Sequence, residues 1–328
     1  MPPSISDLTY VLPIRRVAST AGDELAAYLT ALARLVPVVV VDGSPTSVFA
    51  HHAACWPRSI EHVAVDADRR MDLNGKVAGV VTGLRRVRTA KVVIADDDVR
   101  YDPFALRALA VALDDADVVR PQSFFTPLPW HALLDTGRIL IARATGGDWP
   151  GTLGVRRDVY RRAGGYDGDV LFENLELVRT IRAVGGTERV AFGLYVARRP
   201  ATVRHFATQR VRQAYDEFAR PARMAAQLAI APLAAVAVRR FGVRGAAALA
   251  LGTIALAESG RRRAGGTRVF PAAASLCSPL WVLERAMTSW AALTLRVVRG
   301  GVFYAHGRLR TAANAERALR ERYAEEIA

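Results

Sequence analysis

Three consecutive aspartates, Asp96, Asp97 and Asp98, directly follow the apolar run Val92–Ala95. A short apolar run with β-branched residues predicts a buried strand, and ligands bind at the carboxyl ends of strands in α/β sheets. Because side chains alternate along an extended backbone, we expect Asp96 and Asp98 to point to one side and Asp97 to the other. Two carboxylates that face one point favour a cation between them, and hard oxygen ligands suit Mg²⁺ or Mn²⁺. The alternative is an acidic turn without a ligand.

Two further polar residues stand where strand–helix units bind ligands. Asp42 follows the apolar run Pro37–Val41, so its carboxylate is placed to contact a base or a ribose. Lys76 opens a predicted helix after Asn74-Gly75, where it could reach a phosphate. The alternative for Lys76 is a solvated surface lysine.

Charged residues on two later helices complete the candidate site. Glu173 and Glu176 lie in the first turn of a predicted helix, where the helix dipole favours carboxylates whatever their function. The functional interpretation is a general base. Gln209, Arg210 and Arg212 fall within about one helical turn. They form either a solvated basic face or a clamp for a diphosphate.

The elements that must position these residues alternate between strand and helix. This alternation predicts a mostly parallel sheet with helices on both faces, and therefore the α/β class. A glycine-rich strand followed by a short helix is expected over 149–166. The other predicted strands are 8–13, 37–41, 60–65, 92–95, 117–119 and 190–197, and the predicted helices are 20–35, 74–87, 103–113, 128–143, 171–184 and 203–220.

The composition changes at about Pro221, which divides the chain into a predicted sheet domain over 1–220 and an apolar helical region over 221–328 with a basic tail. None of the uncharged runs in that region reaches the ~20 residues of a comfortable membrane span. Arginine clusters between the runs, with Trp281 and Trp290 near their ends, favour a membrane interface. The alternative is an alanine-rich soluble domain. The uncharged runs are 224–238, 245–257, 270–283 and 286–295.

The charge of the chain narrows the classes of partner. The net charge is +14, and arginine supplies almost all of the positive charge because Lys76 and Lys91 are the only lysines. No zinc-finger spacing or basic region followed by heptads is visible, so nucleic acid is not the expected partner. Cys55 and Cys277 lie far apart in the sequence, which suits a reduced compartment. The first residues lack the pattern of a signal peptide, so we expect the sheet domain in the cytoplasm.

Six motifs in order resemble family 2 glycosyltransferases of the GT-A fold, over roughly residues 6–220. The region after them is similar to the membrane-associated branch that includes ceramide glucosyltransferases, and 301–308 loosely match a late motif of that branch. The six motifs are V-V-D-G-S at 40–44, N-G-K at 74–76, D-D-D at 96–98, G-V-R-R-D-V-Y-R-R-A-G-G-Y at 154–166, F-E-N-L-E-L at 172–177 and Q-R-V-R at 209–212.

The resemblance implies an inverting transfer of sugar from a nucleotide-diphosphate-sugar, with UDP as the expected nucleotide, to a hydroxyl of a lipid or glycolipid. Mg²⁺ or Mn²⁺ is the implied cofactor, and the cytoplasmic side of the inner membrane is the implied location. Implied roles are base or ribose contact for Asp42, the metal for Asp96 and Asp98, the acceptor side for Gly151–Gly154, the general base for Glu173, and the diphosphate for Gln209 and Arg212.

Two departures from the family pattern affect function. Asn174 stands where the family has its aspartate base, and an amide cannot accept a proton at pH 7. Either the base is Glu173, Glu176 or a nearby aspartate, or activity is impaired. Gln213 replaces a tryptophan, which argues against a processive polysaccharide synthase.

Two alternatives to a glycosyltransferase remain at this stage. A nucleotidyltransferase would need a glycine-rich loop near the first strand, and Leu12–Arg16 contains no glycine. A non-catalytic membrane scaffold that binds nucleotide or a partner is favoured by Asn174.

Overall fold

The computed structural model describes residues 5–18, 24–69, 72–304 and 307–327. Within them, a mixed eight-stranded sheet has the order β3-β2-β1-β4-β7-β6-β8-β5. Strands β1, β2, β3 and β4 run parallel to one another, and β6 is parallel to β8. Strand β7 is antiparallel to β4 and β6, and β5 is antiparallel to β8. The mostly parallel sheet predicted from the sequence is thus confirmed. The strands are β1 (Leu8–Ile14), β2 (Val38–Asp42), β3 (Glu61–Ala64), β4 (Lys91–Ala95), β5 (Val99–Arg100), β6 (Val118–Phe125), β7 (Thr152–Arg156) and β8 (Glu188–Arg198).

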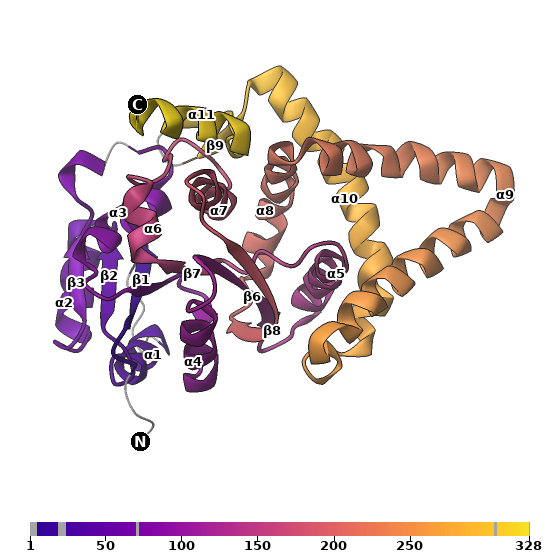
Figure 1. Cartoon of the computed structure of the whole chain (residues 1–328). Helices are drawn as coiled ribbons and strands as arrows, with labels where there is room; N and C mark the ends of the chain where they lie inside the picture. Colours follow the sequence, from indigo (N-terminus) through magenta and orange to yellow (C-terminus); the bar gives the residue numbers. More distant parts are fainter. Residues whose placement is uncertain (1–4, 19–23, 70–71, 305–306, 328) are drawn as a thin grey trace.

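Helices cover both faces of this sheet (Figure 1), which also confirms the prediction. One face packs on α1 and α4 through leucines such as Leu29 and Leu109, and the other packs on α3, α6 and α7. Helix α3 packs very close to β1 at Gly83. A Cβ at this position would lie 2.5 Å from Val11 Cγ1, so a larger residue would not fit there without a shift. The first seven helices are α1 (Glu24–Leu32), α2 (Thr46–Cys55), α3 (Gly75–Arg86), α4 (Pro103–Ala112), α5 (Trp130–Ala144), α6 (Arg157–Arg162) and α7 (Glu173–Ala183).

The later part of the chain is helical and returns to the sheet at its end. Helix α9 projects from the rest of the molecule and bends back toward it, and α10 packs against α9 (Figure 1). Both pack against α5, and α11 packs against α7. These elements are α8 (Val203–Tyr215), the 3₁₀ turn η2 (Asp216–Ala219), α9 (Pro221–Arg262), η3 (Arg263–Arg268), α10 (Ala272–Arg299), β9 (Val302–Tyr304), β10 (Gly307–Leu309) and α11 (Glu316–Ile327).

Helix α9 changes the expectation for the apolar runs. The first two runs form one helix that is interrupted at Gly242, where φ is 59° and ψ is −140°. The stretch Pro221–Arg268 is long and apolar enough to cross a membrane, and only 11% of its most apolar window is buried in the structure. The break at Gly242 lies among the arginines at 239, 240 and 244, so these residues separate two helical arms, as the sequence indicated. Membrane association stays a prediction.

Other differences from the predicted elements are local. Helix α2 was missed, since the sequence D-G-S-P after β2 indicates a turn and the helix has only Val48 and His52 buried. The expected tail contains α11. The first predicted helix, 20–35, begins at Glu24, and residues 19–23 lie outside the described residues.

Candidate functional site

Two cavities open at the carboxyl edge of the parallel strands. The smaller, of about 800 Å³, is bounded by the ends of β1 and β2 and by the start of α3. The larger, of about 920 Å³, is bounded by α5, α7, α8 and α10. Asp96 and Asp97 line both cavities. The aspartates predicted from the sequence therefore lie at the boundary between two candidate binding spaces.

The three aspartates form a turn and do not continue the strand. Strand β4 ends at Ala95, and the Val99 N–H donates to the Asp96 carbonyl oxygen at 3.1 Å. The expected alternation of side chains does not apply beyond the strand, and Asp97 lines the cavities rather than turning away from them. The Asp96 N–H donates to the Gly151 carbonyl oxygen at 2.9 Å, which joins this turn to the loop before β7.

Lys76 links the aspartate turn to helix α7. Its Nζ lies 2.5 Å from Asp96 Oδ1 and 2.6 Å from Glu173 Oε1. Burial alone would lower the pKa of Lys76, but the two carboxylates outweigh burial and raise it. Lys76 was expected to reach a phosphate. The structure instead places it between two carboxylates, where its charge offsets theirs.

Asp96 and Asp98 fit a divalent cation. Asp98 Oδ2 accepts from Arg198 Nε at 3.1 Å, while Asp98 Oδ1 is buried and has no hydrogen-bond partner within the described part of the chain. Burial raises the pKa of Asp96, and repulsion from Asp98 and Glu173 adds to this effect. Excess negative charge and an unused carboxylate oxygen are what a hard cation would satisfy. The sequence named the same two residues as metal ligands, and that role stays a prediction.

Asp42 lies in the smaller cavity as the centre of a hydrogen-bonded cluster. His52 Nδ1 lies 2.7 Å and His62 Nε2 lies 3.1 Å from Asp42 Oδ2, and the Ser44 N–H donates to Oδ1 at 2.9 Å. Burial would raise the pKa of Asp42, but these bonds outweigh burial and lower it. Asp42 is therefore an anion at neutral pH.

The same three side chains could be considered a metal site, because their donor atoms lie within 4.8 Å of one another. A metal on His52 Nδ1 would place the ring proton on Nε2. That atom is buried and has no hydrogen-bond partner among the residues described, whereas metal-bound histidines usually donate their second N–H. The geometry favours two imidazole N–H donors on Asp42 over a metal.

Gln209 and Arg212 both line the larger cavity, and Arg212 Nη1 donates to Gln209 Oε1 at 3.1 Å. Arg210 lies outside the lining of both cavities. It is buried between Asp135 and Glu284, at 3.0 and 2.7 Å, and so holds α8 against α5 and α10. Because successive helical residues point in different directions, the basic cluster seen in the sequence divides between a cavity and a structural contact.

The carboxylates of α7 divide in the same way. Glu173 lines the larger cavity, as does Asn174. Glu176 lies outside the lining of both cavities and is fully buried, where its carboxylate accepts from the Asn314 backbone N–H at 2.7 Å and side-chain amide at 2.8 Å. Glu176 anchors the segment that leads to α11, so the structure does not place this candidate base where an acceptor could reach it.

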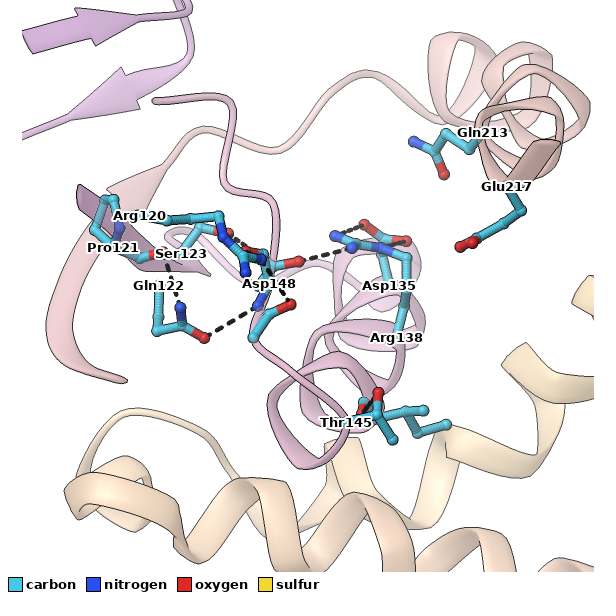
Figure 2. A network of polar contacts seen from close by, with 12 residues as sticks. Arg120, Pro121, Gln122, Ser123, Asp135, Arg138, Thr145, Asp148, Gln213 and Glu217 are labelled. Atoms are coloured by element: carbon cyan, nitrogen blue, oxygen red, sulfur yellow. Dashed lines mark hydrogen bonds and ion pairs between the residues drawn. The ribbon is translucent and has the colours of Figure 1, made fainter. Parts of the chain in front are cut away.

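A buried polar network underlies the larger cavity (Figure 2). Arg138 lies 2.8 Å from Asp148 and 3.1 Å from Asp135, and Ser123 Oγ donates to Asp148 at 2.8 Å. Arg120 donates to the carbonyl oxygens of residues 146–148. These contacts fix the loop that ends at Gly151, and through Gly151 they fix the aspartate turn.

Two residues on the cavity wall were not singled out from the sequence. Arg198 lies at the end of β8 beside Asp98, and the only sequence signal was the pair of arginines before Pro200. Asp216 begins η2 and lines the larger cavity. Burial raises the pKa of Asp216 to about 7, with help from the charge of Glu173. Nothing in the local sequence distinguishes Asp216 from a surface aspartate at a helix end.

The fold is similar to that of solved glycosyltransferase structures. No protein-family model and no curated protein sequence matches the chain. Among solved structures, it is similar to a mannosyltransferase from Pyrobaculum calidifontis in complex with GDP-mannose and Mn²⁺, with a TM-score of 0.51 and 19% sequence identity. The similarity covers 89% of this chain and 87% of that chain, so it includes most of the helical region.

Weaker similarities cover smaller parts of the chain. Glucosyl-3-phosphoglycerate synthase from Mycobacterium tuberculosis is 16% identical, with 61% of this chain and 74% of that chain covered and a TM-score of 0.40. Residues 1–349 of TarS from S. aureus are 14% identical, with 61% and 60% covered and a TM-score of 0.42. None of these three is a ceramide glucosyltransferase, so that branch stays a prediction. The chain has a GT-A-like fold with a mostly parallel sheet, followed by a long helical region.

Proposed function

We propose that this chain is an inverting, metal-dependent glycosyltransferase that uses a nucleotide-diphosphate-sugar, with UDP or GDP as the nucleotide. One observation carries the proposal: the aspartate turn, with its unused Asp98 oxygen, stands at the boundary between two cavities. A donor that spans this boundary would place its base near Asp42 and its sugar in the larger cavity. The mannosyltransferase of similar fold binds GDP-mannose and Mn²⁺.

The residues of this chain would act on the donor in distinct ways. Asp42 would accept a hydrogen bond from the base or ribose, and Arg212 would offset the charge on the diphosphate. Lys76 is a positioning residue because it holds Asp96 and Glu173 in place. A Mg²⁺ or Mn²⁺ held by Asp96 and Asp98 would neutralise charge on the leaving diphosphate. An acceptor hydroxyl in the larger cavity would attack from the face opposite the diphosphate, which inverts the anomeric centre.

Substitution of Asp98 tests this proposal. Asp98→Ala removes the unused oxygen, so it should abolish Mn²⁺-dependent transfer and hydrolysis of UDP- and GDP-sugars. Asp115→Ala is the matched control, since the Asp115 side chain is 79% exposed and pairs with Arg189 at 3.8 Å. A purified Asp98→Ala protein with wild-type turnover in Mn²⁺ would refute the metal role.

A lipid or glycolipid acceptor is the second part of the proposal, and helix α9 supports it. Its apolar side chains are exposed, with Leu233 63%, Phe241 61% and Val243 85% accessible. Exposed arginines at 239, 240 and 244 flank the break at Gly242. Exposed apolar side chains beside clustered arginines fit an anionic membrane surface. We propose that α9 holds the cavities at the cytoplasmic side of the inner membrane.

Charge reversal on α9 tests membrane binding. Each arginine near an anionic surface contributes about 1 kcal/mol, so the triple variant Arg239→Glu, Arg240→Glu and Arg244→Glu should bind phosphatidylserine vesicles at least ~100-fold more weakly. The matched control is Arg317→Glu with Arg320→Glu and Arg322→Glu on α11, which should bind as the wild type does. Sedimentation with vesicles measures both, and equal binding by the two triple variants would exclude α9 as the membrane contact.

A non-catalytic nucleotide-binding scaffold is the alternative that Asn174 favours. The two functions differ in turnover. Titration of UDP and GDP with Mn²⁺ measures binding, and release of free nucleotide from UDP-glucose or GDP-mannose measures turnover. Binding without any release would favour the scaffold.

A further inference from the structure

An inverting transfer needs a general base in the larger cavity to take the proton of the acceptor hydroxyl. Glu173 is bonded to Lys76, and although burial would raise its pKa, Lys76 outweighs burial and lowers it. A carboxylate with a lowered pKa that is already paired with an ammonium is a weak base. Asn174 is an amide, and Glu176 is held by Asn314 outside both cavities. Helix α7 thus offers no carboxylate suited to this role.

Asp216 lines the same cavity and differs from these residues in its bonding. It begins η2 directly after α8, which carries Gln209 and Arg212 to the same cavity wall. The side chain is half-buried, and its Oδ1 is shielded from solvent without a hydrogen-bond partner within the described ranges. A shielded carboxylate oxygen without a hydrogen-bond partner is an unsatisfied acceptor beside the cavity, and a ligand hydroxyl would satisfy it.

The charges around Asp216 come from four elements. Arg212 on α8 and Arg285 on α10 stabilise its ionised form, whereas Glu173 on α7 and Glu217 on η2 oppose it. Burial is the largest influence, and together these groups raise the pKa of Asp216 to about 7. A base is most effective when its pKa lies near the working pH, since it is then both deprotonated and able to hold a proton.

We propose that Asp216 is the general base that takes the proton of the acceptor hydroxyl, in place of the aspartate that Asn174 replaces. This inference rests on the proposed function. As the acceptor oxygen bonds to the anomeric carbon, its proton passes to the Asp216 carboxylate. The bond between the anomeric carbon and the diphosphate oxygen breaks, and its electron pair leaves with the nucleoside diphosphate. Asp216 then returns the proton to solvent.

The experiment measures Mn²⁺-dependent hydrolysis of UDP-glucose and GDP-mannose, with water as the acceptor, from pH 5.5 to 8.5. Wild-type kcat should rise with pH and level off above about 7. Asp216→Asn should lower kcat by about 10²–10⁴-fold, remove the rise with pH, and leave the KM of the donor within about threefold. Asp216→Glu keeps a carboxylate, so it should retain a measurable kcat that still rises with pH. This variant therefore distinguishes loss of the base from loss of the fold.

Restoring the family residue provides a second arm. Asn174→Asp in the Asp216→Asn background should recover at least tenfold in kcat, and Asp115→Asn should behave as the wild type. Wild-type turnover by Asp216→Asn, or a rise with pH that persists in it, would overturn the assignment of Asp216 alone. A wild-type protein that neither binds nor hydrolyses either donor with Mn²⁺ would overturn the proposed function and this assignment with it.

Discussion

Asp42 and Asp216 are two carboxylates on the walls of adjoining cavities, and they are in opposite states. Three donors from β3, α2 and the turn after β2 bond Asp42, and they outweigh burial and lower its pKa. Asp216 has an oxygen without a partner among the described residues, and burial raises its pKa to about 7. Asp42 therefore stays ionised at neutral pH, whereas Asp216 can gain or lose a proton near neutral pH.

The contrast assigns different tasks to the two cavities. A fixed anion suits recognition, because it accepts an N–H or O–H from a base or ribose without changing its own charge. A group that titrates near pH 7 suits proton transfer. The difference follows from hydrogen bonding, since both oxygens of Asp42 receive hydrogen bonds, whereas Asp216 Oδ1 has no partner among the described residues.

Substitution of Asp42 tests the comparison most severely. Asp42→Asn removes the charge, and because a hydrogen bond to a charged group contributes about 1.5–3 kcal/mol, affinity for UDP or GDP with Mn²⁺ should fall by about 10–100-fold. Asp216→Asn should leave that affinity within about threefold. Isothermal titration measures both, and equal losses in the two variants would show that the cavities do not divide recognition from proton transfer.

Substitution of Gly151 tests whether its close contact with Asp96 holds the aspartate turn between the two cavities. Its φ is +68°, and a Cβ there would meet Asp96 Oδ2 at 2.5 Å. Gly151→Ala should destabilise the protein by about 1–3 kcal/mol and also weaken Mn²⁺-dependent nucleotide binding. Gly146→Ala is the matched control, because its φ is +130° and nothing lies within 4 Å of the added Cβ. If both variants keep wild-type nucleotide binding, contact with Asp96 does not hold the aspartate turn.

The pH dependence of stability gives the smallest expected effect. The pKa of Asp216 is raised in the folded state, so the stability that it contributes is fully present below its unfolded pKa of about 4 and is lost as pH rises through about 7. Asp216→Asn should therefore melt about 2–4 °C above the wild type at pH 8 and show a smaller difference at pH 6. Melting curves at the two pH values measure this, and a constant difference would contradict the raised pKa.

Features that depend on neighbouring residues in the sequence could be predicted: the buried strands, the residues at their ends and the start of a helix. The apolar runs of β1, β2 and β4 are long enough to specify buried parallel strands, and Asp42 and Asp96 follow from where those strands end. Asn74 was expected at the start of a helix, and its side chain accepts from the Lys76 N–H as the N-cap of α3. Local rules determine these features.

Contacts between distant segments could not be predicted in this way. Lys76 meets Glu173 from 97 positions away, and Glu176 meets Asn314 from 138 positions away. The carboxylates of α7 look equivalent in the sequence, and only their partners on α3 and before α11 distinguish them. Asp216 depends on burial among α7, α8 and α10, which no local pattern encodes.

The central claim is that the aspartate turn binds a nucleotide-sugar together with a divalent metal. A melting-temperature screen with UDP-, GDP- and dTDP-sugars, each with Mn²⁺ or with EDTA, tests it directly, because a ligand that binds only the folded state raises the melting temperature. We predict that at least one UDP- or GDP-sugar stabilises the wild type only with Mn²⁺ and that Asp98→Ala loses this shift. No shift with any of these donors in Mn²⁺, or an equal shift in Asp98→Ala, would contradict the account.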